Sequence, residues 1–104
     1  MPRGIWIFAI LMAAGTAGLA QSDGEATYKA QCQMCHGATG QGDTPAGKAL
    51  QAKSLTDPEV VKETDAAIIE HIKSGSTKMP AFKEKLTDAQ LEELVAYIRT
   101  LEKK

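Results

Sequence analysis

The stretch Cys32-Gln33-Met34-Cys35-His36 decides how the rest of this chain is interpreted. A C-x-x-C-H sequence is the attachment signature of a c-type haem. Two thiols at that spacing can each add across a vinyl group of one porphyrin, and the histidine that follows is then held under the iron. We therefore expect one covalently bound haem c, with its iron, on Cys32, Cys35 and His36.

Three other kinds of site share this cysteine spacing. A zinc site needs four protein ligands, or three and a water, but the chain has only two cysteines and its only other histidine is His71. A thioredoxin-like redox pair belongs beside a βαβ pattern, and no alternating Val/Ile/Thr-rich strand precedes Cys32. A structural disulfide would join Cys32 to Cys35 but would leave the adjacent His36 unexplained. Disulfide or dithiol chemistry is therefore the main alternative to haem.

The N-terminus has the pattern of a secretory signal peptide. Residues 1–3 form a short basic start, and residues 4–14 are almost wholly apolar. Gly18 and Ala20 then supply small residues at the −3 and −1 positions of a signal-peptidase site. We expect cleavage between Ala20 and Gln21.

Cleavage at this point would divide the chain into a signal peptide over residues 1–20 and a single domain over residues 21–104. An uncleaved membrane anchor is the alternative, but Gly15, Thr16 and Gly18 interrupt the apolar run, which falls short of the ~20 residues that a spanning helix needs. We expect the mature protein in the periplasm or another exported compartment. A domain of about 80 residues supplies only a modest core, and a large apolar porphyrin would enlarge it.

Two segments have clear helical patterns. Thr87 to Gln90 reads as a capping box, and aliphatic residues follow at three- and four-residue spacing, namely Leu91, Leu94, Val95, Ile98 and Leu101. The segment from Asp65 to Lys73 has a cap at Thr64, a stop at Gly75, and three isoleucines on one stripe. Both patterns predict amphipathic helices.

The remaining segments have weaker helical patterns or turn patterns, and none has the pattern of a strand. Ser22 or Asp23 can cap a helix from about Gly24 to Gln31, and Asp57 before a proline permits a brief helix over residues 58–62. The run from Gly37 to Gly47 consists of turn-forming residues and predicts an irregular loop. No alternating apolar stretch appears after the signal peptide. We expect an all-α domain of three to four helices wrapped around one haem.

Met79 is the strongest candidate for the second axial ligand of the iron. It lies in a loop between two helices, and Pro80 directly after it restricts its backbone. Met34 lies inside the attachment motif and cannot reach the far face of the haem. Methionine also serves as a gap-filling core residue, and His71 is the rival ligand. The metal ligands expected are therefore His36 and Met79.

These motifs resemble the class I cytochromes c. The matching residues are Cys32, Cys35 and His36 followed by Gly37, the loop Lys78-Met79-Pro80-Ala81-Phe82, and a closing helix with Leu94, Tyr97 and Ile98. The methionine loop looks most like that of the small soluble kind which cyanobacteria and algae use between photosynthetic complexes. The likeness spans most of the chain from Gly24 to Leu101.

The resemblance implies further contacts within the domain. It implies that the first and last helices cross closely, with Gly24 and Tyr28 placed against Leu94 and Tyr97. It also implies that a backbone carbonyl in the loop after the motif accepts the Nδ1–H of His36, which fixes its tautomer. Pro45 is the residue we match to that carbonyl.

The resemblance also implies an electron carrier rather than an enzyme. With both axial positions filled by protein, the iron has no open site for a substrate, and it can still change oxidation state. A haem-bearing subunit that feeds a larger oxidoreductase is an alternative, as is a gas-binding protein if Met79 is not a ligand. A dithiol protein without haem is the third.

We expect transient redox-protein partners, such as a membrane cytochrome complex, an oxidase, a reductase or a photosystem, and a monomeric protein. The chain has 12 basic and 13 acidic side chains, for a formal net charge of −1. That balance is too mild to favour nucleic acid. Lys78, Lys83 and Lys85 flank the methionine loop, where they could steer acidic partners or be ordinary solvated surface.

Overall fold

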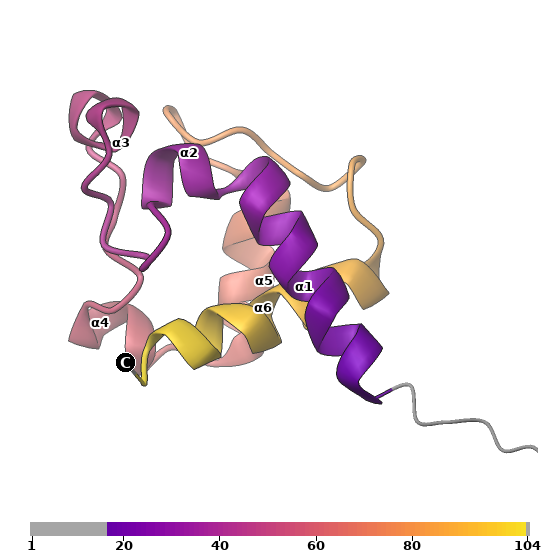
Figure 1. Cartoon of the computed structure of the whole chain (residues 1–104). Helices are drawn as coiled ribbons and strands as arrows, with labels where there is room; N and C mark the ends of the chain where they lie inside the picture. Colours follow the sequence, from indigo (N-terminus) through magenta and orange to yellow (C-terminus); the bar gives the residue numbers. More distant parts are fainter. Residues whose placement is uncertain (1–16, 104) are drawn as a thin grey trace, which may run out of the picture.

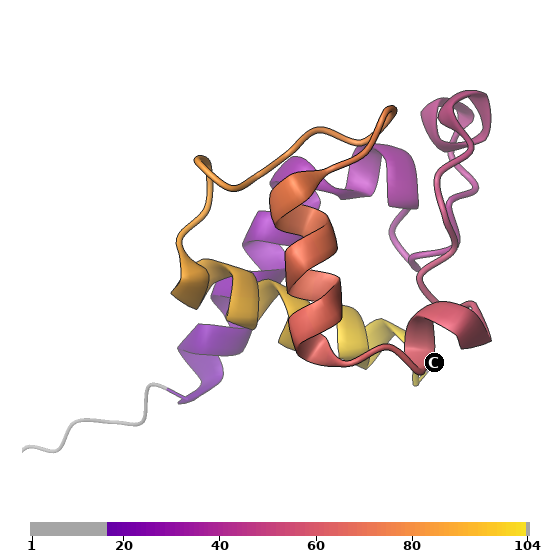
Figure 2. The same cartoon turned by 180° about the vertical axis from the view of Figure 1, so that it is seen from behind.

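The computed structural model describes residues 17–103, and that part of the chain is helical without strands. The helices are α1 (Ala17–Gln31), α2 (Gln33–His36), α3 (Pro45–Leu50), α4 (Pro58–Val61), α5 (Asp65–Ser74) and α6 (Asp88–Leu101). Figures 1 and 2 show α1 crossing α6, with α5 packed beside α6. The all-α class is confirmed. The described residues hold six helices instead of three to four, because α2, α3 and α4 are short segments of six residues or fewer.

The hydrophobic core lies where α1, α5 and α6 meet. α6 begins at the predicted capping box, in which Thr87 Oγ1 accepts the N–H of Gln90 at 3.1 Å and Gln90 Oε1 accepts the N–H of Thr87 at 2.8 Å. The five aliphatic residues predicted on α6 are all buried. The core consists of Tyr28, Cys32, Val60, Ile68, Ile72, Phe82, Leu91, Leu94, Val95, Ile98 and Leu101. The attachment cysteine Cys32 is thus part of the core.

The crossing of α1 over α6 depends on a glycine. A Cβ atom at Gly24 would collide with the backbone carbonyl of Glu93, so only glycine lets the two helices approach this closely. One turn later, the rings of Tyr28 and Tyr97 lie with centroids 5.4 Å apart and planes tilted by 51°. Leu94 and Tyr28 are fully buried there. The expected contact between the first and last helices is confirmed.

α1 begins earlier than the sequence predicted. The cap expected at Ser22 or Asp23 does not start the helix, which already includes Ala17, the first residue that the structure describes. Alanine and leucine are strong helix formers, and those in residues 17–20 continue the helix toward the N-terminus. Most of the expected signal peptide, residues 1–20, lies outside the described residues, so its cleavage stays a prediction.

A helix that crosses a membrane must be long and predominantly apolar. None of the helices within residues 17–103 combines the length and the apolar character needed to cross a bilayer.

The shorter helices start at capping residues. Thr64 Oγ1 accepts the N–H of Ala67 at 3.1 Å, and α5 ends at Gly75, as predicted. Asp57 Oδ1 accepts the N–H of Glu59 at 3.1 Å, which starts α4 with a proline at its first position. These capping residues determine where α4 and α5 begin. The connection between the two helices depends on tertiary contacts.

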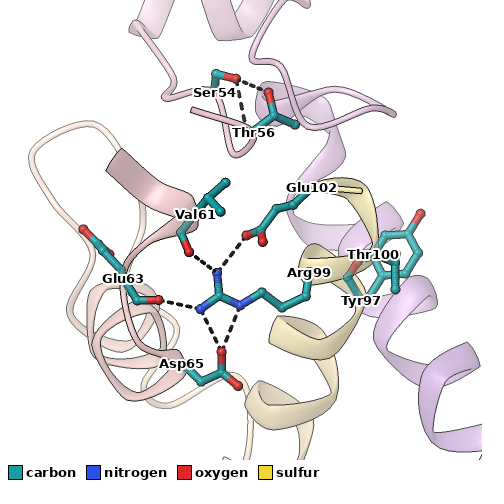
Figure 3. Close-up of polar contacts among 9 residues, drawn as sticks. All are labelled: Ser54, Thr56, Val61, Glu63, Asp65, Tyr97, Arg99, Thr100 and Glu102. Carbon is teal, nitrogen blue, oxygen red and sulfur yellow. Dashed lines mark hydrogen bonds and ion pairs between the residues drawn. The ribbon is translucent and has the colours of Figure 1, made fainter. Parts of the chain in front are cut away.

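Arg99 fastens the end of α6 to the segment between α4 and α5 (Figure 3). Its guanidinium contacts Asp65 through Nε and Nη2, both at 2.9 Å, and Glu102 through Nη1 at 2.8 Å. It also donates to the backbone carbonyls of Val61 and Glu63. The Arg99 side chain is 22% exposed and that of Glu102 is 9% exposed, whereas Asp65 is 66% exposed, so the charge-assisted hydrogen bond to Glu102 is the most shielded of these contacts.

An Arg99→Met variant should lower the free energy of unfolding by about 1–2 kcal/mol, because it removes charge-assisted hydrogen bonds and leaves the largely buried carboxylate of Glu102 unpaired. Urea unfolding of the intact protein measures this. The control is Lys29→Met, which breaks the exposed ion pair with Glu25 and should change stability little. A loss within about 0.5 kcal/mol for Arg99→Met, typical of an ordinary surface substitution, would contradict this role.

Candidate functional site

The two cysteines and the histidine of the motif lie together at the junction of α1 and α2. Cys32 caps α2, and its carbonyl accepts the N–H groups of Cys35 at 3.2 Å and His36 at 2.9 Å. Both cysteines are free thiols; Cys32 is buried and Cys35 is half-buried. Helical geometry thus places Cys32 and His36 one turn apart, with Cys35 between them.

The environment of Cys32 separates haem attachment from dithiol redox chemistry. Burial raises the pKa of the Cys32 thiol to about 11, and the neighbouring Cys35 thiol contributes in the same direction. Catalytic redox cysteines need the opposite change, a lowered pKa that supplies the thiolate. The position of Cys32 in the core therefore argues against the dithiol alternative.

His36 is oriented by a backbone carbonyl. Its Nδ1 lies 2.9 Å from the carbonyl oxygen of Lys53, which can accept the Nδ1–H. Burial lowers the pKa of His36, and the hydrogen bond to Lys53 partly opposes this. A neutral imidazole with Nδ1 engaged in this way leaves Nε2 as the nitrogen that can bind a metal.

The carbonyl partner of His36 is Lys53, and the match to Pro45 was wrong. Pro45 is the first residue of α3, and the carbonyl before it, that of Thr44, accepts the N–H of Lys48 at 2.8 Å. Carbonyls in the first turn of a helix point along its axis and are not free for an external donor. The carbonyl of Lys53 follows α3 in an irregular segment and faces His36 instead.

The same error lies in the loop predicted over residues 37–47. The structure begins α3 at Pro45, with Thr44 as its cap: Thr44 Oγ1 accepts the N–H of Gly47 at 2.8 Å. A capping residue followed by proline is a helix start, the same signal that correctly predicted α4 at Asp57. Gly42 and Gly47 on either side of Thr44 favour turns, which is why the sequence pattern alone predicts a loop here.

The loop after the motif is tied back to α1 and α2. Thr44 Oγ1 donates to the carbonyl of Met34 at 2.6 Å, and the N–H of Gly42 donates to the carbonyl of His36 at 2.7 Å. The buried hydroxyl of Tyr28 donates to the carbonyl of Gly37 at 2.6 Å. These contacts hold α2 in place on both sides of His36. Sequence reasoning had missed Thr44 and the hydroxyl of Tyr28 as positioning groups.

Met79 lies on a separate loop between α5 and α6. It is half-buried and packs against the core that contains Cys32. The tip of this loop lies beside the end of α3 in both views (Figures 1 and 2), and Lys78 Nζ donates to Gln51 Oε1 at 2.8 Å. Phe82 is buried and its N–H donates to the carbonyl of Ile72 at 3.0 Å.

The rival ligand His71 points elsewhere. Its side chain is 72% exposed, and its Nε2 lies 3.6 Å from a carboxylate oxygen of Glu63. Among residues 17–103, no cluster of three or more His, Cys, Asp or Glu side chains could hold a metal ion. That finding leaves the zinc alternative without support in the described part of the chain.

The donor groups fit a covalently attached haem. Two free thiols stand at the spacing of thioether attachment, and the imidazole beside them is oriented through Nδ1. Met79, the candidate that the sequence suggested for the second ligand position, packs half-buried against the same core on a loop that Lys78 ties to Gln51. The two thiols and the oriented imidazole are therefore the groups that would hold the haem.

Comparison with known proteins gives consistent results. The family described as "Cytochrome C oxidase, cbb3-type, subunit III" matches residues 19–98. Cytochrome c6 of Leptolyngbya boryana is 35% identical over 75 residues, which cover 72% of this chain and 85% of that protein. The cbb3-type cytochrome c oxidase subunit CcoP of Azospirillum brasilense is 30% identical over 88 residues, covering 83% of this chain and 30% of that subunit.

A solved structure shares the fold as well. The KustC0563 c-type cytochrome superposes with a TM-score of 0.71 and 38% sequence identity, and the match covers 77% of this chain and 98% of that one.

Proposed function

Since the chain belongs to the cytochrome c family and carries covalently bound haem c, we propose that it is an exported one-electron carrier whose iron is bound by His36 and Met79. The observation that carries the proposal is the orientation of His36. Its Nδ1 faces the carbonyl of Lys53 at 2.9 Å, beside the free thiols of Cys32 and Cys35. An imidazole fixed in this way is prepared to bind iron through Nε2.

Each residue of the site has a distinct role in this proposal. Cys32 and Cys35 form the two thioether bonds, and Met79 supplies a soft sulfur ligand. Bound haem supplies a one-electron couple, and a thioether ligand favours the reduced iron and raises the reduction potential. Cys32 is buried in the core and Met79 packs half-buried against it, which limits the access of water to the site. Protein ligands at both axial positions leave no place for a substrate, so the protein transfers electrons and is not an enzyme.

The compartment follows from the chemistry of the N-terminus. Cleavage between Ala20 and Gln21 would release residues 21–104 as the mature domain in the periplasm or a comparable lumen. N-terminal sequencing of the purified protein tests this: a start at Gln21 is expected, and an intact Met1 in the mature protein would show that the segment is retained as an anchor.

A redox titration of the purified protein, followed by its optical spectrum, tests the carrier function. A carrier gives a single reversible one-electron wave, and its reduced form binds carbon monoxide poorly because Met79 occupies the iron. Rapid and complete binding of carbon monoxide to the wild-type protein would favour the gas-binding alternative instead.

A second candidate function has specific support. The matching family is described as a subunit of a cbb3-type oxidase, and the Azospirillum relative is such a subunit, of which this chain covers 30%. The protein could therefore deliver electrons within a larger oxidoreductase. Size-exclusion chromatography of gently extracted native protein separates the two: a carrier elutes alone as a monomer, and a subunit elutes with its complex.

Partner association should be electrostatically steered through the methionine loop. Lys83 is exposed there; Lys78 is bonded to Gln51, and Lys85 Nζ lies 5.4 Å from the centroid of the Phe82 ring. We expect Lys83→Glu to slow oxidation of the reduced protein by anionic ferricyanide about threefold at low salt, and the difference to vanish at high salt.

The matched control for this steering is Lys62→Glu, which makes the same charge change at the exposed end of α4. It should slow the reaction with ferricyanide much less. Equal effects of the two variants, or rates that do not depend on ionic strength, would show that the lysines of the loop are ordinary solvated surface.

A further inference from the structure

We propose that Ser76 is a positioning residue that keeps the thioether of Met79 on the iron. The inference rests on the proposed function, in which Met79 is the second axial ligand. Ser76 itself does not contact the ligand sulfur. It acts through the backbone of Met79, which it holds from two sides.

Ser76 and Met79 exchange a pair of hydrogen bonds that closes a tight turn. The N–H of Ser76 donates to the carbonyl of Met79 at 2.9 Å. In the other direction, the N–H of Met79 donates to Ser76 Oγ at 3.3 Å. Both backbone polar groups of Met79 are thereby bound by one residue, so rotation of the Met79 backbone would break at least one of these bonds.

Ser76 is in turn anchored to α5 through Gly75. The backbone of Gly75 has φ of +68°, a left-handed conformation that favours glycine, and its N–H donates to the carbonyl of His71 at 2.8 Å. A Cβ atom at this position would come within 2.7 Å of the N atom of Ala81 and the carbonyl oxygen of Met79. The chain therefore folds back directly over the end of the helix, where a larger residue would displace Met79.

The downstream side of Met79 is fixed independently. Pro80 restricts the backbone that follows, and the N–H groups of Phe82 and Lys83 donate to the carbonyls of Ile72 and Lys73 at 3.0 and 3.2 Å. The segment after Met79 is thus fastened along the last turn of α5. The hydroxyl of Ser76 provides the upstream fastening, and it is the one side-chain contact that holds the Met79 N–H.

This arrangement predicts how Ser76 affects exchange at the iron. In the exchange, the bond from iron to the Met79 sulfur breaks and a bond to carbon monoxide forms, with no electron transferred. Only molecules with Met79 released can bind carbon monoxide, so the apparent affinity rises in proportion to the released fraction. The hydrogen bond is exposed and 3.3 Å long, so its loss should raise that fraction about twofold, at the lower end of the range for hydrogen bonds.

The test compares three serine variants of the haem-loaded protein. In Ser76→Ala, the apparent affinity of the reduced protein for carbon monoxide should rise about twofold, and the charge-transfer band of the oxidised protein between methionine sulfur and iron should weaken. Ser76→Thr retains an acceptor oxygen and should restore the wild-type values. Ser74→Ala is the matched control, because Ser74 Oγ donates to Glu70 and not to the methionine loop.

Two results would overturn the inference, and they are distinguishable. If Ser76→Ala matches wild type and Ser74→Ala while Met79→Ala loses the charge-transfer band, then Met79 is the ligand and Ser76 does not position it. If Met79→Ala changes neither the band nor carbon monoxide binding, the proposed ligation itself fails, and the role of Ser76 fails with it. Because Ser76 is exposed, the unfolding midpoint of the Ser76→Ala variant should stay near that of the wild type. This result separates positioning of Met79 from a general loss of stability.

Discussion

A Cys32→Ala/Cys35→Ala double variant is expected to be largely unfolded after export. A chain of about 80 residues forms only a marginal core by itself. Here Cys32 belongs to that core, and α2 ends at His36 beside it. Removing both thiols removes the covalent bonds to haem, and with them the apolar group and the iron bonds that join the α2 segment to the methionine loop. The expected loss is most of the few kcal/mol by which such a domain is stable.

Circular dichroism of the purified double variant measures this effect. We expect reduced helical signal and a broad thermal transition without cooperativity. The control is Met34→Ala, which lies between the two cysteines but is 75% exposed and should leave haem attachment and stability close to wild type. Cooperative unfolding of the double variant near the temperature of the haem-loaded protein would contradict the idea that haem completes the core.

A Gly24→Leu substitution is expected to disrupt the crossing of α1 and α6. Even the first side-chain atom at this position would collide with the carbonyl of Glu93, and a backbone group in the middle of a helix cannot move aside at little cost. Separating the helices would also expose the buried Tyr28 and Leu94. We expect a loss of about 3 kcal/mol or more in the free energy of unfolding, and a smaller loss for Gly24→Ala.

Urea unfolding of the haem-loaded variants checks this expectation. Ala26→Leu is the matched control, because it adds the same side chain to an exposed position of α1 and should change stability by no more than about 0.5 kcal/mol. If Gly24→Leu unfolded at the same urea concentration as Ala26→Leu, the close contact of the two helices would not contribute to stability.

Elements with complete local signals were predictable from the sequence. α6 has a capping box and five aliphatic residues on one stripe, and α5 lies between Thr64 and Gly75. The relatives named cytochrome c6 confirm the likeness drawn from the attachment motif and the Met79 loop. In each of these elements and motifs, the side chains within the segment itself determine its structure.

Features that depend on distant backbone were not predictable. The partner of His36 is a main-chain carbonyl, which every residue possesses, so nothing in the side chain of Lys53 marks it. Arg99 has the pattern of a surface residue beside its i,i+3 neighbour Glu102 until tertiary packing brings Asp65 and the carbonyl of Glu63 to it. The helix α1 extends N-terminal to the expected cap at Ser22 because the residues before that position also favour a helix.

Part of the candidate site was predictable from the sequence, and part of it depends on the folded structure. Cys32, Cys35 and His36 were predicted together because adjacency in sequence already places them on one helical turn. Met79 was predicted from its loop and from Pro80, and the structure packs it against the same core. The pair of hydrogen bonds between Met79 and Ser76 needs the folded turn, and a serine three residues before a methionine carries no such signal.

Optical spectroscopy of the purified protein tests the proposal that His36 and Met79 bind the iron of this cytochrome. Optical spectra of the purified protein in both oxidation states should show a covalently attached low-spin haem. The oxidised form should have the charge-transfer band between methionine sulfur and iron, and Met79→Ala should lose that band. A spectrum without covalent haem would contradict attachment at Cys32 and Cys35. A band that persists in Met79→Ala would show that Met79 does not bind the iron.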